Sequence, residues 1–418
     1  MLALRSESHF STGATFRMTI KGLNLTRPGT RHLTVIAALL AMIGPFSIDA
    51  YLPSFPDIEI EFGISRAILS QSLAVYLVAF AVSTLAWGPL ADRFGRRLVI
   101  LISMALYTLG SIGCALAENA EIFMLLRVVQ GLAASGGFIA GRAMIRDAHD
   151  AEAAHRAMSQ VMMLFALAPA IAPVLGGWLH DQFGWRSVFW FLSVFGSLLV
   201  LMGILIKETL HDEQRRSIHP GAVKRVYLEA ILHKRFPALI LCVSLSFGGL
   251  FLYIAGAPTV IYDFLGLGSA DFGWLFIPIV SGLVLGAFIS SRLAHRWPAH
   301  RTISAGLLVM MLACVLNILS VNFTTAGIIT LVGPLVLYVS GLAVMMPAIT
   351  VLALDCLPNH RGTAASMQGF LQSVSNAAVA SIAVPLLNTR WLDFVTGQLV
   401  FLLAAAGLWY YLEQRRPA

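Results

Sequence analysis

The sequence predicts an all-α membrane protein in which twelve transmembrane helices form two pseudo-symmetric bundles of six helices each. Three observations predict this fold class: an apolar composition, long continuous apolar blocks, and a similarity between the two halves of the chain. Of the 418 residues, 58% are hydrophobic and only 12% are charged, whereas soluble domains carry about 25% charged residues. This composition excludes a soluble globular fold and intrinsic disorder.

Each apolar block is long enough for a helix that crosses a hydrocarbon core of about 30 Å. Helices are expected rather than a β-barrel, because barrel strands are short segments of alternating polarity. The predicted spans cover residues 32–53, 68–91, 97–117, 122–141, 157–180, 186–206, 237–262, 272–291, 302–320, 327–354, 364–387 and 391–411.

The distribution of lysine and arginine predicts the orientation of these spans, because cytoplasmic segments carry an excess of both residues. With the N-terminus inside, 24 of the 28 lysines and arginines fall on the cytoplasmic side. Arg66, Arg186 and Arg390 fall outside, and Arg127 lies within a span. We therefore expect a multi-pass protein of the cell membrane, the inner membrane of a bacterium, with both termini in the cytoplasm. The net charge of +7 then requires no nucleic-acid partner.

A polar, basic segment in the middle of the chain separates six predicted spans from six. The expected parts are a cytoplasmic leader (1–31), a first six-helix bundle (32–206), a cytoplasmic linker (207–236), a second six-helix bundle (237–411) and a cytoplasmic tail (412–418). Within the leader, Met18 is an alternative to Met1 as the first residue in the cell.

Two short matches relate the halves. Leu-Ala-Asp-Arg-Phe at 90–94 corresponds to Leu-Ala-His-Arg-Trp at 293–297, and His155-Arg156 corresponds to His360-Arg361. The offsets are 203 and 205 residues, and both matches fall in predicted cytoplasmic loops. A duplication of six helices predicts a central cavity between the halves and transport by alternating access. Because that cavity lies within one chain, we expect a monomer.

Several segments resemble a known family. The loop at 88–97, Gly-Pro-Leu-Ala-Asp-Arg-Phe-Gly-Arg-Arg, resembles the signature loop of the major facilitator superfamily. The segments 127–131 (Arg-Val-Val-Gln-Gly) and 168–177 (Ala-Pro-Ala-Ile-Ala-Pro-Val-Leu-Gly-Gly) resemble motifs of its twelve-helix drug/proton antiporters. The segments 49–56 (Asp-Ala-Tyr-Leu-Pro-Ser-Phe-Pro) and 141–147 (Gly-Arg-Ala-Met-Ile-Arg-Asp) resemble its bicyclomycin/chloramphenicol-resistance subfamily.

This resemblance implies the major facilitator fold and proton-coupled efflux of drugs or antibiotics by alternating access. The protein is then a secondary active transporter rather than an enzyme. It uses no metal or other cofactor, the proton gradient supplies the energy, and its partners are an amphipathic drug, protons and membrane lipids. Two alternatives stay open: an exporter of a small metabolite such as an amino acid or sugar, and a non-transporting membrane receptor or scaffold. An ATP-driven pump is excluded, because no lysine is followed by the Ser or Thr of a phosphate-binding loop.

Asp49 is the acid that lies most clearly within an apolar run. A charged side chain at the centre of a span costs about 2.5–3.5 kcal/mol on insertion scales. A carboxyl group in apolar surroundings takes up a proton more readily than one in water, which a proton-coupled carrier requires. We therefore predict that Asp49 is the proton-coupling acid. The alternative is an interfacial acid at a helix end, since Pro53 and Pro56 follow closely.

Arg127 is the cation within a span, and its predicted depth matches that of Asp49. The two side chains are expected to meet or to compete for one cavity, so that Arg127 controls the ionisation of Asp49. The resemblance also assigns Arg127 to the proton-relay motif of the antiporters. The alternative is an arginine whose charged end reaches the membrane interface.

The signature loop is predicted to act as a conformational latch between the halves rather than as a substrate site. We expect Gly88 to admit a neighbouring helix and Gly95 to adopt a positive φ. Asp92 is expected to pair with one of the nearby arginines, and the alternative is charge that only sets topology. The predicted latch residues are Gly88, Asp92, Arg93, Gly95, Arg96 and Arg97.

The motif in the fifth span combines helix-bending prolines with small residues that allow close packing. The resemblance associates Pro169, Pro173, Gly176 and Gly177 with the direction of export, although Ala172 stands where the broader antiporter motif has glycine. The alternative is an ordinary kinked helix.

The substrate cavity is predicted to combine polar side chains with aromatic walls. Gln368, Gln372 and Asn376 follow one face of the eleventh span. Because the chain has 25 phenylalanines, each aromatic candidate is also a candidate for the core or for a lipid-facing surface. The other candidates are Tyr51, Tyr76, Gln130, Phe247, Phe251, Tyr253 and Tyr338.

Overall fold

The computed structural model describes residues 31–210, 220–294, 296–323 and 327–414. Within these ranges the chain is almost entirely helical, and twelve helices are long and apolar enough to cross a membrane. The predicted all-α fold with twelve spans is therefore confirmed. The predicted leader, apart from Arg31, lies outside the described residues.

The first half contains six candidate spans, and the first of these is interrupted. Its elements are α1 (Arg31–Asp49), η1 (Leu52–Ser54), α2 (Phe55–Phe62), α3 (Arg66–Phe94), α4 (Arg96–Leu116), α5 (Ala120–Ala148), α6 (Ala151–Phe183) and α7 (Arg186–Leu205). A short helix, α8 (Pro220–Leu232), lies within the predicted linker, where no helix was predicted.

The second half also contains six candidate spans, and two π-helical segments, η3 and η6, interrupt its regular helices. Its elements are α9 (Phe236–Ala255), η3 (Thr259–Phe264), η4 (Ser269–Phe272), α10 (Gly273–Leu293), α11 (Ala299–Phe323), α12 (Ile328–Asp355), η5 (Pro358–His360), α13 (Arg361–Ala378), η6 (Val379–Ala383), α14 (Val384–Leu387) and α15 (Trp391–Gln414).

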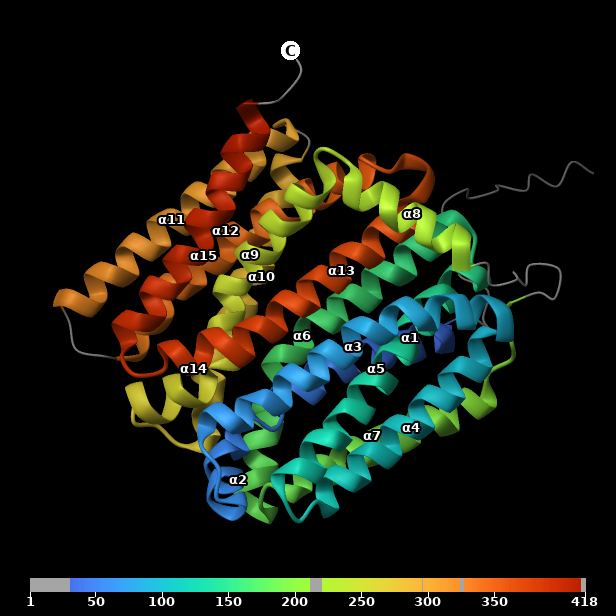
Figure 1. Cartoon of the computed structure of the whole chain (residues 1–418), viewed down its shortest axis with the longest axis horizontal. Helices are drawn as coiled ribbons and strands as arrows, with labels where there is room; N and C mark the ends of the chain where they lie inside the picture. Colours follow the sequence, from blue (N-terminus) through green and yellow to red (C-terminus); the bar gives the residue numbers. More distant parts are fainter. Residues whose placement is uncertain (1–30, 211–219, 295, 324–326, 415–418) are drawn as a thin grey trace, which may run out of the picture.

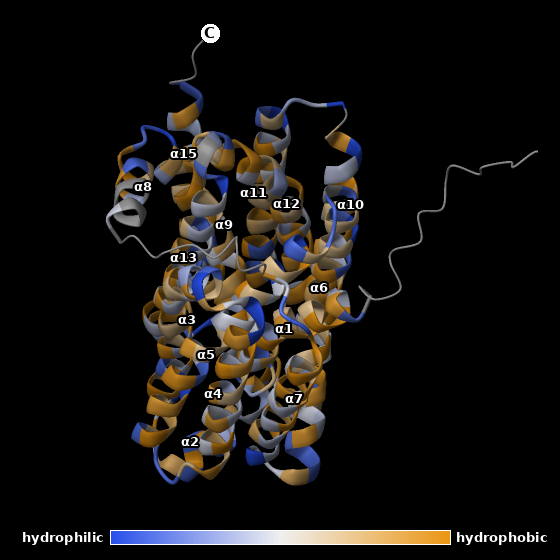
Figure 2. Ribbon diagram, turned by 90° about the vertical axis from the view of Figure 1, so that its right-hand side faces the viewer, coloured by the Kyte–Doolittle hydropathy of each residue, from blue (hydrophilic) through white to orange (hydrophobic). Residues whose placement is uncertain are grey.

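The helices form two groups that follow the halves of the sequence. Figure 1 shows α1–α7, in blue and green, as one bundle and α9–α15, in yellow to red, as the other. In the first bundle α5 packs against α3 and α4, and in the second α12 packs against α10 and α11. Apolar residues cover most of the helix lengths (Figure 2), as a lipid environment requires.

Polar residues at the helix ends determine where several spans begin and end. Ser65, Asn119 and Asp150 cap α3, α5 and α6, and each side chain accepts a backbone hydrogen bond from the first turn. Gly95 and Gly184 follow α3 and α6 with φ of 98° and 78°, a backbone conformation that favours glycine. The positive φ predicted for Gly95 is thus confirmed.

The break in the first span has a local cause. Pro53 has no N–H to donate to the carbonyl of Asp49, four residues earlier, and α1 ends at Asp49. The chain then turns through η1 and resumes as α2, so the first candidate span extends to Phe62, nine residues beyond the predicted end at 53. Asp49 therefore lies near the middle of this span and at a helix end at the same time.

Polar contacts between the two halves gather at one end of the molecule, which we call the closed end. The closed end includes the start of α3, the end of α6, η3 and η4. The distribution of lysine and arginine predicts that this end faces the outside of the cell. The contacts join Arg66 to Asp263 and to Thr259, the Tyr262 hydroxyl to the Pro53 carbonyl at 2.6 Å, and the Ser269 hydroxyl to Asp181.

A further contact at the closed end depends on a proline. Pro385 has no N–H to donate to the carbonyl of Ser381, and the helix there is π-helical. The freed carbonyl of Ser381 accepts a hydrogen bond of 3.0 Å from the Gln71 side chain of α3. A backbone irregularity in the second half is therefore satisfied by the first half.

Candidate transport site

Asp49 is buried at the C-terminal end of α1, with 3% of its surface exposed. One carboxyl oxygen, Oδ1, has no hydrogen-bond partner among the described residues. A buried carboxylate without a partner is costly, whereas a neutral carboxyl group is tolerated far better. The following residue, Ala50, continues the helical hydrogen bonding by donating to the Phe46 carbonyl at 3.2 Å.

Arg127 of α5 is fully buried, so the alternative of an arginine that reaches the membrane interface does not apply in this structure. Its guanidinium donates to the Ser47 carbonyl at 2.9 Å and to Gln130 Oε1 at 2.8 Å. The same group lies 4.5 Å from the ring centre of Tyr51 and 4.6 Å from that of Tyr76. Carbonyl dipoles and aromatic faces thus stabilise the charge from several sides.

The structure brings Arg127 to α1 but does not pair it with Asp49. The guanidinium reaches the backbone of Ser47, two residues before the acid, and the described ion pairs do not include Arg127. The contact with Ser47 brings Arg127 to the end of α1 that carries Asp49, but the predicted contact between the two side chains is not present among the described residues. Arg127 Nε has no hydrogen-bond partner among the described residues.

A chain of hydroxyl and amide groups extends from Arg127 through the first bundle. Gln130 donates to Ser111 at 2.7 Å, and the hydroxyls of Ser47 and Tyr107 are 2.6 Å apart. Ser47, Tyr107 and Ser111 were not predicted as site residues. Tyr107 and Ser111 are four residues apart within a span, and polar residues at that spacing on an apolar helix are the signal that was available.

Three of the predicted cavity residues, Tyr51, Tyr76 and Gln130, belong to this cluster around Arg127, and all three are buried. Tyr51 also shares a hydrogen bond of 3.1 Å with Ser72. We call Asp49, Arg127 and these three residues the acid–arginine cluster.

The aromatic candidates of the second half divide into two kinds. Tyr253 and Tyr338 are fully buried inside the second bundle. The Tyr253 hydroxyl accepts a hydrogen bond from the Asn317 amide, and the Tyr338 hydroxyl donates one to the Ser246 carbonyl. Their place in a cavity wall stays a prediction, since in this structure both hydroxyls are satisfied within the second bundle. Phe247 and Phe251 stack on each other with ring centres 6.4 Å apart.

The polar face of α13 retains hydrogen-bonding capacity. Gln368 and Asn376 are 8% exposed, and Gln372 is half-buried. Gln368 donates to Thr350 at 3.0 Å, but its Oε1 and the Oδ1 of Asn376 have no partner among the described residues. Unsatisfied amide oxygens in a span are suited to a polar ligand or to water.

The signature loop forms an ion-pair network inside the first bundle. Arg96 pairs with Asp92 of α3 at 2.6 Å and with Asp147 of α5 at 2.8 Å. The carboxylate of Glu208, just after α7, accepts the backbone N–H groups of Arg96 and Arg97 at the start of α4. Asp147 and Glu208 were not predicted as partners, although Asp147 lies within the segment 141–147 that resembles the subfamily.

These contacts connect α3, α4, α5 and α7, all of which belong to the first half. The described network therefore does not join the two halves, as the predicted latch would. Arg93 is exposed and lies over the Phe94 ring at 5.2 Å. The close approach predicted at Gly88 is not seen, because a Cβ there would meet no atom within 4 Å.

The glycines of the α6 motif do make close contacts. A Cβ at Gly176 would collide with the carbonyl of Ala50, and a Cβ at Gly177 would collide with the carbonyl of Ser269 in the other half. Pro173 is buried and Pro169 is half-buried one turn earlier. The motif therefore brings α6 against the residue that follows Asp49 and against the closed end.

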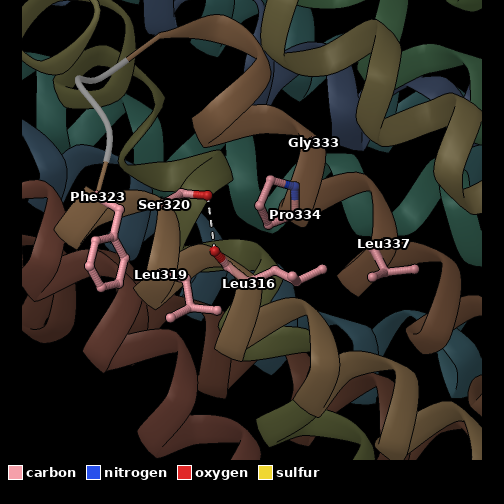
Figure 3. Close-up of a pocket in the computed structure, with 7 residues that line it drawn as sticks. All are labelled: Leu316, Leu319, Ser320, Phe323, Gly333, Pro334 and Leu337. Carbon is pink, nitrogen blue, oxygen red and sulfur yellow. Dashed lines mark hydrogen bonds between the residues drawn. The ribbon is translucent and has the colours of Figure 1, made fainter.

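A separate hollow of about 450 Å³ lies between α11 and the start of α12 (Figure 3). Its lining carries no charged side chain, and Ser320 already donates to the Leu316 carbonyl at 2.9 Å. None of the predicted site residues lines it, so it does not coincide with the candidate transport site. Its lining residues are Leu316, Leu319, Ser320, Phe323, Gly333, Pro334 and Leu337.

A comparison with known protein families decides the identity of the fold. The sequence profile of the Major Facilitator Superfamily matches residues 37–380, from α1 into η6. The chain belongs to the major facilitator superfamily. Its family and fold make it a membrane transporter rather than an enzyme.

Relatives with curated names support the subfamily that the motifs indicate. The MFS-type transporter YdgK of Bacillus subtilis is 29% identical and covers 88% of this chain and 94% of its own length. The bicyclomycin resistance protein homolog of Haemophilus influenzae is 27% identical, and the match covers 82% of this chain and 86% of the homolog. The chloramphenicol resistance protein of Pseudomonas aeruginosa is 25% identical, covering 85% and 86%.

Solved structures of the superfamily share the fold at low identity. A bacterial homolog of the human lysosomal transporter Spinster, solved in an inward-facing and unoccupied conformation, superposes with a TM-score of 0.74. The identity is 17%, and the match covers 94% of this chain and all of the other. At this identity the likeness supports the fold alone.

Proposed function

We propose that this major facilitator protein exports amphipathic drug molecules in exchange for protons, by alternating access between its two bundles. Relatives named for resistance to bicyclomycin and chloramphenicol support the substrate class. The observation that carries the proton coupling is Asp49, a buried acid with an unpartnered oxygen within a membrane span.

In the proposed cycle, Asp49 binds a proton while its carboxyl group is enclosed, because a neutral group is less costly there. The proton leaves when the site opens to the cytoplasm and water or a cationic drug stabilises the carboxylate. Binding of drug and binding of proton then exclude each other at one residue, which is the requirement for exchange.

Arg127 is proposed to stabilise the ionised form of Asp49. Within the described part of the chain its Nε has no hydrogen-bond partner, and its guanidinium already lies against α1 through the Ser47 carbonyl. A small movement of α1 relative to α5 would bring the carboxylate to this donor. The pair would then form in one conformation and separate in another.

Alternating access in this proposal opens the closed end and closes the opposite end. With the predicted orientation, the structure corresponds to a transporter that is shut toward the outside. The acid–arginine cluster draws its residues from α1, α3 and α5 and from Tyr51, just after α1. From the second half, α13 packs against α3, and its amide oxygens are proposed to complete the cavity.

The proposal is tested in everted membrane vesicles that hold the wild-type chain or Asp49→Asn, with an imposed proton gradient and a fluorescent drug as substrate. We expect gradient-driven drug uptake to fall at least tenfold in the variant, whereas drug exchange without net proton movement persists, since asparagine cannot carry a proton. The matched control is Asp393→Asn, which changes an acid near a span end of the other bundle.

Undiminished proton-driven uptake by Asp49→Asn would overturn the role of this residue. Drug-resistance profiles of cells that overexpress either form test the substrate class. Protection that depends on Asp49 supports drug export, whereas no protection together with altered excretion of an amino acid or sugar supports metabolite export.

A further inference from the structure

A basic hollow lies between the C-terminal end of α5 and the beginning of α6, at the helix ends opposite the closed end. Its volume is about 330 Å³. Three side chains that carry or can carry positive charge line it, together with two small or apolar residues: Arg142, Arg146, Ala154, His155 and Met158.

Arg142 occupies an unusual environment for a cation. Its guanidinium lies 4.6 Å from the ring centre of Phe138, and its terminal nitrogen is 3.4 Å from the sulfur of Met162. Its Nε is buried and has no hydrogen-bond partner in the described ranges, and the described ion pairs do not include this arginine. An arginine held among apolar groups with unused donors is suited to an anion from outside the chain.

The acids near this hollow are engaged elsewhere. Asp147 pairs with Arg96 at 2.8 Å, Glu152 pairs with Arg156 at 2.7 Å, and Asp150 accepts a backbone N–H at the start of α6 at 2.8 Å. The charge that lines the hollow is therefore not balanced by these carboxylates.

The duplication of the fold does not require this charge. At the offset of 205 residues that relates the halves, positions 142 and 146 correspond to Pro347 and Val351. The second bundle thus builds the same helix end without either arginine. The two arginines are therefore particular to the first bundle.

The surface next to the hollow is apolar. Met162 and Met163 on the next turns of α6 are 42% and 61% exposed. A ligand that combines a phosphate group with a hydrocarbon chain fits both parts, and membrane lipids of the anionic class have this chemistry. Arginine pairs recognise phosphate oxygens through parallel N–H donors.

We propose that Arg142, Arg146 and His155 form a binding site for the phosphate group of an anionic membrane lipid, whose acyl chain lies along the exposed methionines of α6. The site lies at the predicted cytoplasmic end, where anionic lipids are concentrated. It is separate from the acid–arginine cluster and does not depend on proton coupling.

The test uses the full chain in nanodiscs of phosphatidylcholine with an increasing fraction of phosphatidylglycerol. Native mass spectrometry measures the lipid that the protein retains, and thermal unfolding measures its stability. We expect the wild type to retain phosphatidylglycerol and to unfold at higher temperature as its fraction rises. The double variant Arg142→Gln, Arg146→Gln should retain at least tenfold less. Arg156→Gln, which alters an exposed and paired arginine near the same loop, should behave as the wild type.

Equal retention by the wild type and the double variant would overturn the proposal, as would an equal loss in Arg156→Gln, which would indicate only general surface charge. Glycerol 3-phosphate and inorganic phosphate, added to phosphatidylcholine nanodiscs, form the second arm. Stabilisation by either that matches phosphatidylglycerol would replace the lipid with a soluble phosphate as ligand. If the double variant does not fold, Arg142→Lys and Arg146→Gln are measured singly, and unchanged retention in both overturns the proposal.

Discussion

Arg127 keeps a positive charge inside the first bundle without an acidic partner among the described residues. The guanidinium combines two hydrogen bonds, to Ser47 and Gln130, with contacts to the faces of Tyr51 and Tyr76. A planar group with several donors can make all four contacts at once, whereas an ammonium group cannot. The geometry of the arginine, as well as its charge, therefore matters at this position.

We predict that Arg127→Lys loses most proton-driven drug uptake and lowers stability by about 2 kcal/mol, since hydrogen bonds to charged groups and buried cation–π contacts are each of this order. Thermal unfolding of the purified protein and vesicle uptake measure the two effects. Arg186→Lys is the control, because Arg186 also lies over an aromatic ring but is partly exposed. Wild-type uptake by Arg127→Lys would show that charge alone suffices.

At the scale of elements, α6 connects the candidate site to the closed end. Successive glycines on this helix contact the backbone of Ala50, next to Asp49, and the backbone of Ser269, in the second half. A movement of α6 would therefore displace both the backbone next to Asp49, the proposed proton-coupling acid, and the contact between the halves. The small residues of the motif are required by these close approaches rather than by helix bending alone.

Gly177→Val should open the closed end, because the added side chain would collide with the backbone carbonyl of Ser269, which cannot rotate away. Overpacking of this kind costs about 1–3 kcal/mol, enough to shift the balance between conformations at least fivefold. Labelling of a cysteine placed at Ser269 by an impermeant maleimide measures the opening in whole cells.

The matched control for this substitution is Gly407→Val in α15, where a Cβ would meet no atom within 4 Å. An increase in labelling for Gly177→Val and none for Gly407→Val is expected. Equal labelling of both variants and the wild type would contradict a role for Gly177 in closing this end.

On the scale of the whole molecule, a few polar contacts hold the two bundles together at the closed end. Arg66 pairs with Glu59 of its own half at 2.9 Å and with Asp263 of the other half. Asp263 is 48% exposed, so its pair with Arg66 contributes only about 0–1 kcal/mol. Such a weak contact can be broken and remade in each transport cycle.

Asp263→Asn should therefore raise the fraction of molecules that are open at this end by a few-fold, without trapping the protein in one conformation. The same maleimide assay at Ser269 measures this population, and added salt should reduce the difference between variant and wild type. Asp271→Asn is the control, because Asp271 caps η4 within its own half. A variant that labels no faster than the wild type would contradict the assignment of this pair as an inter-half contact that controls opening.

Much of the fold follows from local features of the sequence. Apolar blocks predict the twelve helices because the backbone in lipid must satisfy its own hydrogen bonds, and Pro53, Gly95 and Asp150 determine local breaks and ends. The adjacent small residues Gly176 and Gly177, which follow the prolines of the α6 motif, likewise indicate close packing. These properties depend on residues near one another in the chain, so one sequence suffices.

The sequence by itself determined the number of spans, the pairing of two halves and the candidate acid and arginine. Only the tertiary structure decided that Arg127 binds the Ser47 carbonyl instead of Asp49, that Glu208 holds the start of α4, and that Gln71 satisfies Ser381. Each of these contacts joins residues that are distant in the chain. Their partners depend on the rotation and depth of packed helices, which apolar periodicity leaves undetermined because lipid-facing and buried faces are both apolar.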